Sequence, residues 1–213
     1  MPDKGLKIED FDRVLVVEGY GDLLFYAEVL EELGLEKRVF IKHLGGNTRL
    51  STILETFITP DLLNSKTNLG FIFDADDRPQ ATRDKLQGLL TKLTGQTVVD
   101  GNWTTSTPKV VLFIVPGGDR TGEIETLVWN SWASDPANAH QKQCILDYIA
   151  CMKTAGKTAH SPDKGLISAL LAIQSDEDPR LGPGARDNVF DLTRPELAPL
   201  RTFLSGFQIP GQA

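Results

Sequence analysis

Acidic residues follow short apolar segments at several places in the sequence. These acids are Glu18, Asp74, Asp76, Glu123 and Glu125. In an Asp-x-Asp turn the carboxylates at i and i+2 share a face of an extended chain, so Asp74 and Asp76 can point toward one hard cation. Several such acids held together would bind Mg²⁺, or Mn²⁺ in its place, and act on phosphate esters.

Parallel strands joined by crossover helices would bring these acids to one edge of a sheet. The first half of the chain alternates apolar runs with segments of helical periodicity, in the order β-α-β-α-β-α-β. The expected strands are residues 13–18, 39–44, 69–73 and 109–115, and the expected helices are 23–33, a segment from Asn47 or Thr48 to Pro60, and 79–93. We therefore predict an α/β, Rossmann-like core with a mainly parallel sheet of about four strands. Ligands collect outside the carboxyl ends of the strands in such sheets.

The sequence becomes helical in character after Gly122. Helices are expected over residues 123–132, 137–154, 164–173 and 195–204, and we expect Gly182, Pro183 and Gly184 to interrupt the last two. We divide the chain into an α/β core, residues 8–118, and a C-terminal helical extension, residues 119–213. The extension should pack on the core because its helices carry apolar faces.

Composition and charge exclude some classes of function. The chain has 213 residues, 40% of them hydrophobic, and a net charge of -7, so its surface as a whole repels a phosphate backbone. An acidic protein can still act on phosphodiesters if carboxylates hold a divalent cation and local Lys and Arg residues steer the strand. No apolar run approaches the roughly 18 residues of a membrane span, and the N-terminus does not have the pattern of a secretory signal. We expect a cytoplasmic protein without a membrane partner.

Basic residues near the expected strand ends are candidates for contacts with nucleic acid. Lys42 and Arg49 flank a Gly-Gly turn, and Arg78 follows the Asp-x-Asp pair, so each could touch a phosphate. Lys157 and Lys164 could stabilise the charge that develops on the pentavalent phosphate in a transition state. Solvated lysines with no such role are the alternative.

Two short motifs resemble the Toprim domain of topoisomerases, primases and related nucleases. The segment Val17-Glu18-Gly19-Tyr20-Gly21-Asp22 resembles the first Toprim motif and is closest to its bacterial primase version. The segment Phe73-Asp74-Ala75-Asp76 is similar to the Toprim Asp-x-Asp, and Gly45-Gly46-Asn47 resembles the turn between the two motifs. This resemblance covers about residues 12–116.

A longer resemblance, to a Toprim-related bacterial and archaeal family of unknown function, continues to the C-terminus. It is carried by Gly122-Glu123-Ile124-Glu125-Thr126-Leu127, by residues 157–172 and by the segment LRTFLSGF at 200–207. It implies a variant similar to the overcoming-lysogenization-defect nucleases, which add an acid and a lysine after the core. The chain departs from topoisomerases, because Asp-Arg-Pro follows Asp76 and no tyrosine stands in a strand-passage context.

The resemblance implies roles for individual residues. Glu18 would be a general acid or base, or a metal ligand, and Asp74 and Asp76 would hold Mg²⁺. Asp22 would be either a ligand or a cap of the first helix. Glu125 would complete a second metal site, with Glu123 as its substitute, although both could equally be surface acids at a helix start.

Three classes of function follow. The leading hypothesis is a Mg²⁺-dependent phosphodiester enzyme on DNA or RNA, with a nuclease as the expectation. The second is a Toprim-like module that binds metal, a nucleotide or nucleic acid beside a partner protein and does not cleave. The third, a haloacid-dehalogenase-like phosphotransferase, is disfavoured because that class carries its Asp-x-Asp on the first strand. The helix 79–93 and the Trp103 segment could form the contact of a homodimer, although their pattern does not require one.

Overall fold

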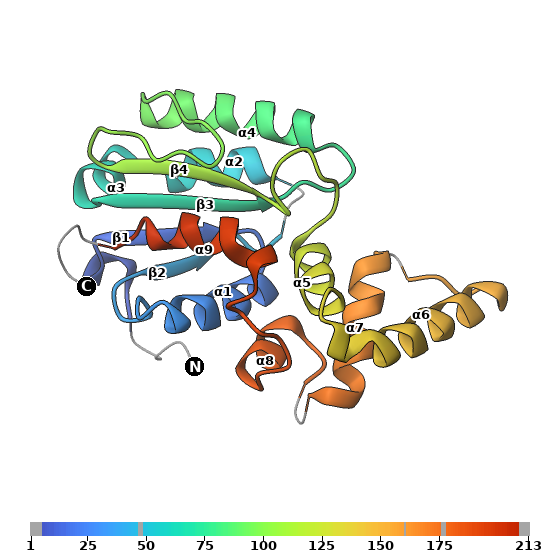
Figure 1. Cartoon of the computed structure of the whole chain (residues 1–213). Coiled ribbons are helices and arrows are strands. Elements are labelled where there is room, and N and C mark those ends of the chain that lie inside the picture. The colour runs from blue at the N-terminus through green and yellow to red at the C-terminus, as the bar shows by residue number, and fades with distance from the viewer. Residues whose placement is uncertain (1–5, 47–48, 160, 176–177, 209–213) are drawn as a thin grey trace.

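The apolar runs of the first half form one parallel sheet. The computed structural model describes residues 6–46, 49–159, 161–175 and 178–208. The strands are β1 (Arg13–Val17), β2 (Phe40–His43), β3 (Asn68–Asp74) and β4 (Lys109–Val115). All are parallel, in the spatial order β2-β1-β3-β4 (Figure 1). The predicted α/β, Rossmann-like fold with a four-stranded sheet is confirmed.

Helices alternate with the strands and then follow them. The first group is α1 (Tyr20–Glu32), α2 (Leu50–Phe57), α3 (Pro60–Ser65) and α4 (Pro79–Thr94). The second group is α5 (Ile124–Ala133), α6 (Ala139–Thr154), α7 (Pro162–Gln174), α8 (Leu181–Arg186) and α9 (Ala198–Ser205). Short 3-10 turns lie at Ile8–Asp10, Pro136–Asn138 and Pro195–Leu197.

Pro60 begins a helix in addition to following one. The Thr59 hydroxyl accepts a hydrogen bond of 3.2 Å from the Leu62 N–H, and Pro60 occupies the first turn, where a missing N–H costs nothing. The sequence pattern predicts only a helix end at Pro60, so α3 was not predicted. The expected start of the preceding helix, Asn47 or Thr48, lies outside the described residues, as does the Asn47 of the Gly-Gly-Asn turn.

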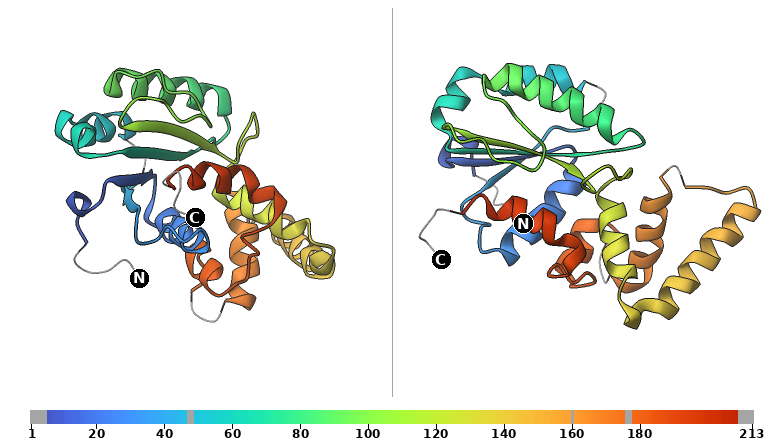
Figure 2. Two further views of the ribbon diagram at one scale, coloured as in Figure 1. Left: turned by 60° about the vertical axis from the view of Figure 1, so that its left-hand side comes forward. Right: turned by 45° about the horizontal axis from the view of Figure 1, so that its top comes forward.

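Two hydrophobic layers cover the sheet, and alternate residues of each strand enter opposite layers. Val14 and Val16 of β1 pack in the cluster beneath α2 and α4, whereas Leu15 and Val17 pack in the cluster with α1. The helices α2, α3 and α4 lie on one face of the sheet, and α1 and α9 lie on the other (Figures 1 and 2). The sheet is therefore enclosed on both sides and exposes its ends.

Gly182, Pro183 and Gly184 lie within the helix α8, so the prediction that these residues form the break between the last two helices is wrong. Residues 181–185 are buried, and α8 packs against α1. A Cβ on Gly182 would collide with the side chain of Leu24. Glycine is therefore used here for close helix contact and does not terminate the helix.

Most of the described chain after Gly118 is helical, and its last helix returns to the sheet. Phe203 of α9 and Phe207 share one core cluster with β1, β4 and α1. Trp103 lies in the excursion between α4 and β4. Its ring packs on those of Phe203 and Phe207, with centroid distances of 6.2 and 5.0 Å. No helix within the described ranges is long and apolar enough to span a bilayer.

Candidate functional site

Glu18 and Asp22 stand at the junction of β1 and α1. Glu18 follows the last residue of β1, and its carbonyl accepts a hydrogen bond of 3.1 Å from the N–H of Gly46, in the turn after β2. One Asp22 carboxylate oxygen accepts a hydrogen bond of 2.8 Å from the Gly19 N–H, so Asp22 caps α1. Burial raises the pKa of Asp22, although the Gly19 hydrogen bond and the charge of Lys164 oppose the shift.

The loop after β3 is tied to the start of α5. Asp74 ends β3, and its Oδ1 accepts a hydrogen bond of 3.1 Å from the Ile124 N–H. Asp76 has a positive φ of 51°, and its backbone exchanges hydrogen bonds of 2.9 and 2.8 Å with Gly122. Gly122 has φ 118°, and a Cβ there would collide with Thr126, so this position requires glycine. The Asp-x-Asp turn is thereby held beside the acids of α5.

The N-termini of α5 and α7 meet through polar contacts. Glu123 is the N-cap residue of α5, and Glu125 lies in its first turn. The Lys164 ammonium of α7 is 2.6 Å from Glu123 Oε2 and 3.8 Å from Glu125 Oε2. Ser161 donates a hydrogen bond to Glu123, and the Thr126 hydroxyl donates one to Asp163. The two acids of α5 therefore reach the strand ends together with a lysine from α7.

Negative charge exceeds positive charge in this cluster, and the pKa values show it. Burial raises the pKa of Asp74 well above its usual range, and the charges of Asp22 and Glu18 raise it further. Burial likewise raises the pKa of Glu125 to about 7, against the opposing charge of Lys164. The pKa of Asp76 is raised by burial and by Glu123. Carboxyls that resist ionisation in this way are typical of functional sites, and a bound cation would relieve them.

The oxygen atoms that this cluster of acids offers are of the kind that a hard divalent cation binds. The candidate metal ligands of the cluster are all carboxylate oxygens. One of them, Glu125 Oε2, is buried and has no hydrogen-bond partner within the described residues. As the side chains stand, no three His, Cys, Asp or Glu residues in the described part of the chain form a group that could hold a metal ion. Glu18, Asp74 and Asp76 would therefore have to turn toward a common point to bind one.

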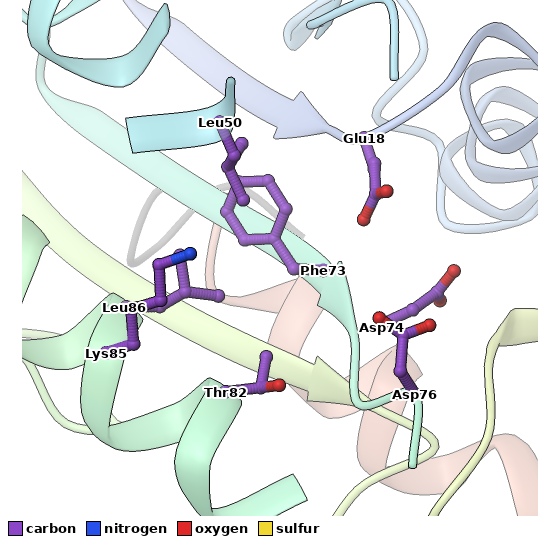
Figure 3. Close-up of a pocket in the computed structure, with 8 residues that line it drawn as sticks. All are labelled: Glu18, Leu50, Phe73, Asp74, Asp76, Thr82, Lys85 and Leu86. Atoms are coloured by element: carbon purple, nitrogen blue, oxygen red, sulfur yellow. The ribbon is translucent and has the colours of Figure 1, made fainter. Parts of the chain in front are cut away.

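A small pocket opens beside three of these acids (Figure 3). Its volume is about 100 Å³. The lining combines the carboxylates of Glu18, Asp74 and Asp76, the polar Thr82 and Lys85, and the apolar Leu50, Phe73 and Leu86. Thr82, Lys85 and Leu86 share one face of α4, because residues spaced by three and four are neighbours on a helix. This spacing, shortly after the Asp-x-Asp pair, is a sequence signal by which Thr82 and Lys85 could have been found.

The structure does not bring every candidate residue to the acids. Lys157 is exposed just beyond α6, and its N–H hydrogen-bonds the Met152 carbonyl. Arg49 and Arg78 are exposed at the starts of α2 and α4, and Lys42 lies on β2. Within the described ranges no ion pair joins any of these four to the acids. Of the two lysines proposed for the transition state, the one that contacts the cluster is Lys164.

The fold and these residues define an α/β protein with an acid-rich site at the carboxyl edge of a parallel sheet. Residues 12–208 match the model of a family described as "Protein of unknown function (DUF3226)", and the chain belongs to this family. The matched range includes Glu18, Asp74, Glu125 and Lys164. No curated protein and no solved structure matches the chain.

Proposed function

We propose that this protein is a Mg²⁺-dependent enzyme that cleaves phosphodiester bonds in DNA or RNA, acting in the cytoplasm. The observation that carries the proposal is the meeting of acids from four separate segments. These are Glu18 after β1, Asp22 in α1, Asp74 at the end of β3 and Glu125 in α5, and the pKa of Asp74 responds to the other three. Ionised carboxylates crowded in this way repel one another, and a bound cation would offset that repulsion.

The Toprim resemblance supports the same proposal. The residues that carry it, Glu18, Asp74 and Asp76, come from two strand ends and line one pocket. In Figure 3 the Glu18 carboxylate points toward Asp74. A resemblance confined to the sequence would not require the three side chains to line one pocket.

Each residue would have a defined task. When bound, Mg²⁺ or Mn²⁺ would neutralise charge on the phosphodiester and activate a water. Asp74 and Asp76 would hold one cation, and Glu125, with Asp22, would hold a second. Glu18 would take the proton of the attacking water or return one to the leaving oxygen, as a new P–O bond forms and the old one breaks. Lys164 would keep the two acids of α5 in place through its ion pairs.

The test is cleavage of supercoiled plasmid, single-stranded DNA and RNA by the purified chain in Mg²⁺ and in Mn²⁺. Glu18→Gln and Asp74→Asn should each lower the rate by roughly 10²–10⁴-fold. Glu55→Gln, an exposed acid of α2, is the matched control and should cleave like the wild type. Chelation of the metal should abolish cleavage by every variant.

Two other outcomes have definite meanings. Cleavage that survives unchanged in both Glu18→Gln and Asp74→Asn would come from a contaminating enzyme and would overturn the proposal. If no substrate is cut, while calorimetry detects Mg²⁺ binding that Asp74→Asn removes, the protein is instead a module that binds without cleaving.

A further inference from the structure

Lys85 is the basic residue of the pocket beside the acids. It projects from α4, next to Leu86, which is buried against the sheet and anchors this turn of the helix. Figure 3 shows Glu18 and Asp74 on one side of the Phe73 ring and the Lys85 ammonium on the other. The pocket therefore has an acidic end, a basic end and an apolar wall.

The two lysines near the acids differ in how their charge is used. Lys164 lies 2.6 Å from one carboxylate and 3.8 Å from a second, so its charge is already balanced within the protein. Lys85 makes no ion pair with any residue in the part of the chain that the structure describes. Its ammonium is therefore available to a negatively charged ligand in the pocket, whereas that of Lys164 is not.

The size of the pocket limits that ligand. Clefts that enclose a whole drug-sized ligand measure roughly 300–1,000 Å³, and this pocket measures about 100 Å³. A nucleoside is too large to enter it completely. A phosphoryl group is small enough, and its oxygens suit a lysine ammonium at one end and a cation held by the acids at the other.

We propose that this pocket binds one phosphoryl group of a nucleic-acid strand and that Lys85 is the residue that holds it. The inference rests on the proposed function, because without a cation the neighbouring carboxylates would repel a phosphate. The phosphoryl group can be an internal phosphodiester or a phosphate at a strand end. Both present the same oxygens to Lys85.

Strand binding by the whole purified chain tests this assignment. The probe is a short fluorescein-labelled DNA single strand, made with a 5′-phosphate or a 5′-hydroxyl, and an unlabelled circular single strand serves as competitor. Binding is followed by fluorescence anisotropy in Ca²⁺, which takes the same oxygen ligands as Mg²⁺. The variants are Lys85→Ala, Lys85→Arg and, as a matched control on the same helix, Lys92→Ala, whose surface pair with Glu55 lies outside the pocket.

Lys85→Ala should weaken binding by about tenfold or more, and Lys85→Arg should restore most of it. Lys85→Ala should also reduce the magnitude of the negative slope of log K against log salt by about 0.7, the value for one phosphate contact of a single strand. Lys92→Ala should leave both quantities near those of the wild type. A dependence on the 5′-phosphate identifies a terminal phosphate, and equal binding with competition by the circle identifies an internal one.

Two results would overturn the assignment, and they differ in what else they remove. If Lys85→Ala binds the strand with the affinity and salt slope of Lys92→Ala, Lys85 holds no phosphoryl group. Mn²⁺ binding, measured by electron paramagnetic resonance on the wild type and Asp74→Asn, tests the proposed function separately. If the wild type binds Mn²⁺ but Lys85→Ala does not weaken strand binding, only the assignment of the phosphoryl pocket is overturned. If the wild type binds no Mn²⁺, the proposed function is overturned as well.

Discussion

The Asp74 carboxylate, at the end of β3, accepts a hydrogen bond of 3.1 Å from the Ile124 N–H, at the first residue of α5. Ile124 lies fifty residues further along the chain. An N–H in the first turn of a helix has no partner within that helix, and a carboxylate there also interacts favourably with the helix dipole. This contact fixes the start of α5 against the strand end and brings Glu125 to the acids of the sheet.

Glu125 should make the protein less stable as pH rises toward neutrality. Its pKa is raised from 4.5 to about 7 in the folded state. Between these values the folded chain binds more protons than the unfolded chain, so the free energy of unfolding falls as pH rises. The loss should be on the order of 3 kcal/mol between about pH 4.5 and pH 7, measured by urea unfolding in the absence of divalent cations.

The Glu125→Gln variant isolates this contribution. Its free energy of unfolding should fall less than that of the wild type over the same pH range, because the amide does not titrate. The pKa of Asp74 is also raised, so the free energy of unfolding of the variant should still fall with pH, by less than that of the wild type. Equal slopes for wild type and variant would show that Glu125 does not titrate in this range.

Divalent cations should raise the melting temperature through Asp74. A ligand that binds only the folded chain stabilises it by about 2.7 kcal/mol at a concentration 100 times its Kd. Scanning fluorimetry at increasing Mg²⁺ or Mn²⁺ should show the increase in the wild type and not in Asp74→Asn. Asp61→Asn, at the exposed start of α3, should respond like the wild type. An identical increase in all three proteins would place the bound cation elsewhere.

Lys164 and Lys157 should differ in their effect on stability. Removing the Lys164 ammonium leaves the nearly buried carboxylate of Glu123 without its 2.6 Å partner, so Lys164→Met should cost about 1–2 kcal/mol near pH 8. Lys157→Met removes an exposed side chain and should change stability by less than about 0.5 kcal/mol. Chemical denaturation of the two variants side by side checks the difference, and equal losses would contradict the pairing.

Lys66 should stabilise the N-terminal segment from the opposite edge of the sheet. It is only 4% exposed, and its ammonium donates hydrogen bonds of 2.7 and 2.6 Å to the carbonyls of Ile8 and Phe11. Lys66→Met leaves both carbonyls without this donor, and we expect a loss of about 2–3 kcal/mol in urea unfolding. Lys109→Met, an exposed lysine of β4, should be nearly neutral.

The sheet and the first acids could be predicted from local sequence. A parallel strand buried on both faces must be apolar throughout, so β1 and β4 were located to within a residue of their ends. Glu18 and Asp74 follow such strands directly, and strand ends of a parallel sheet meet at one edge. Their proximity is thus a consequence of the fold class.

The remaining features depend on contacts between distant segments. Lys164 and Lys157 look alike in the sequence, and only the docking of α7 on α5, across forty-one residues from Glu123, distinguishes them. Lys85 resembles any solvent-facing lysine of an amphipathic helix until the end of β3 is placed beside it. Gly182 has the sequence signature of a helix break, and its use for close packing appears only once α1 lies against it.

The two backbone hydrogen bonds between Asp76 and Gly122 place the candidate site at the interface between the sheet and the helices that follow it. A ligand that contacts both sides of this interface slows the separation of the helices from the sheet, because they cannot move apart while the ligand remains bound. Cation occupancy should therefore be detectable at a distance, as slower amide hydrogen exchange in α5 and α7 together with the end of β3. The bound ligand would therefore set the lifetime of the contact between the C-terminal helices and the sheet.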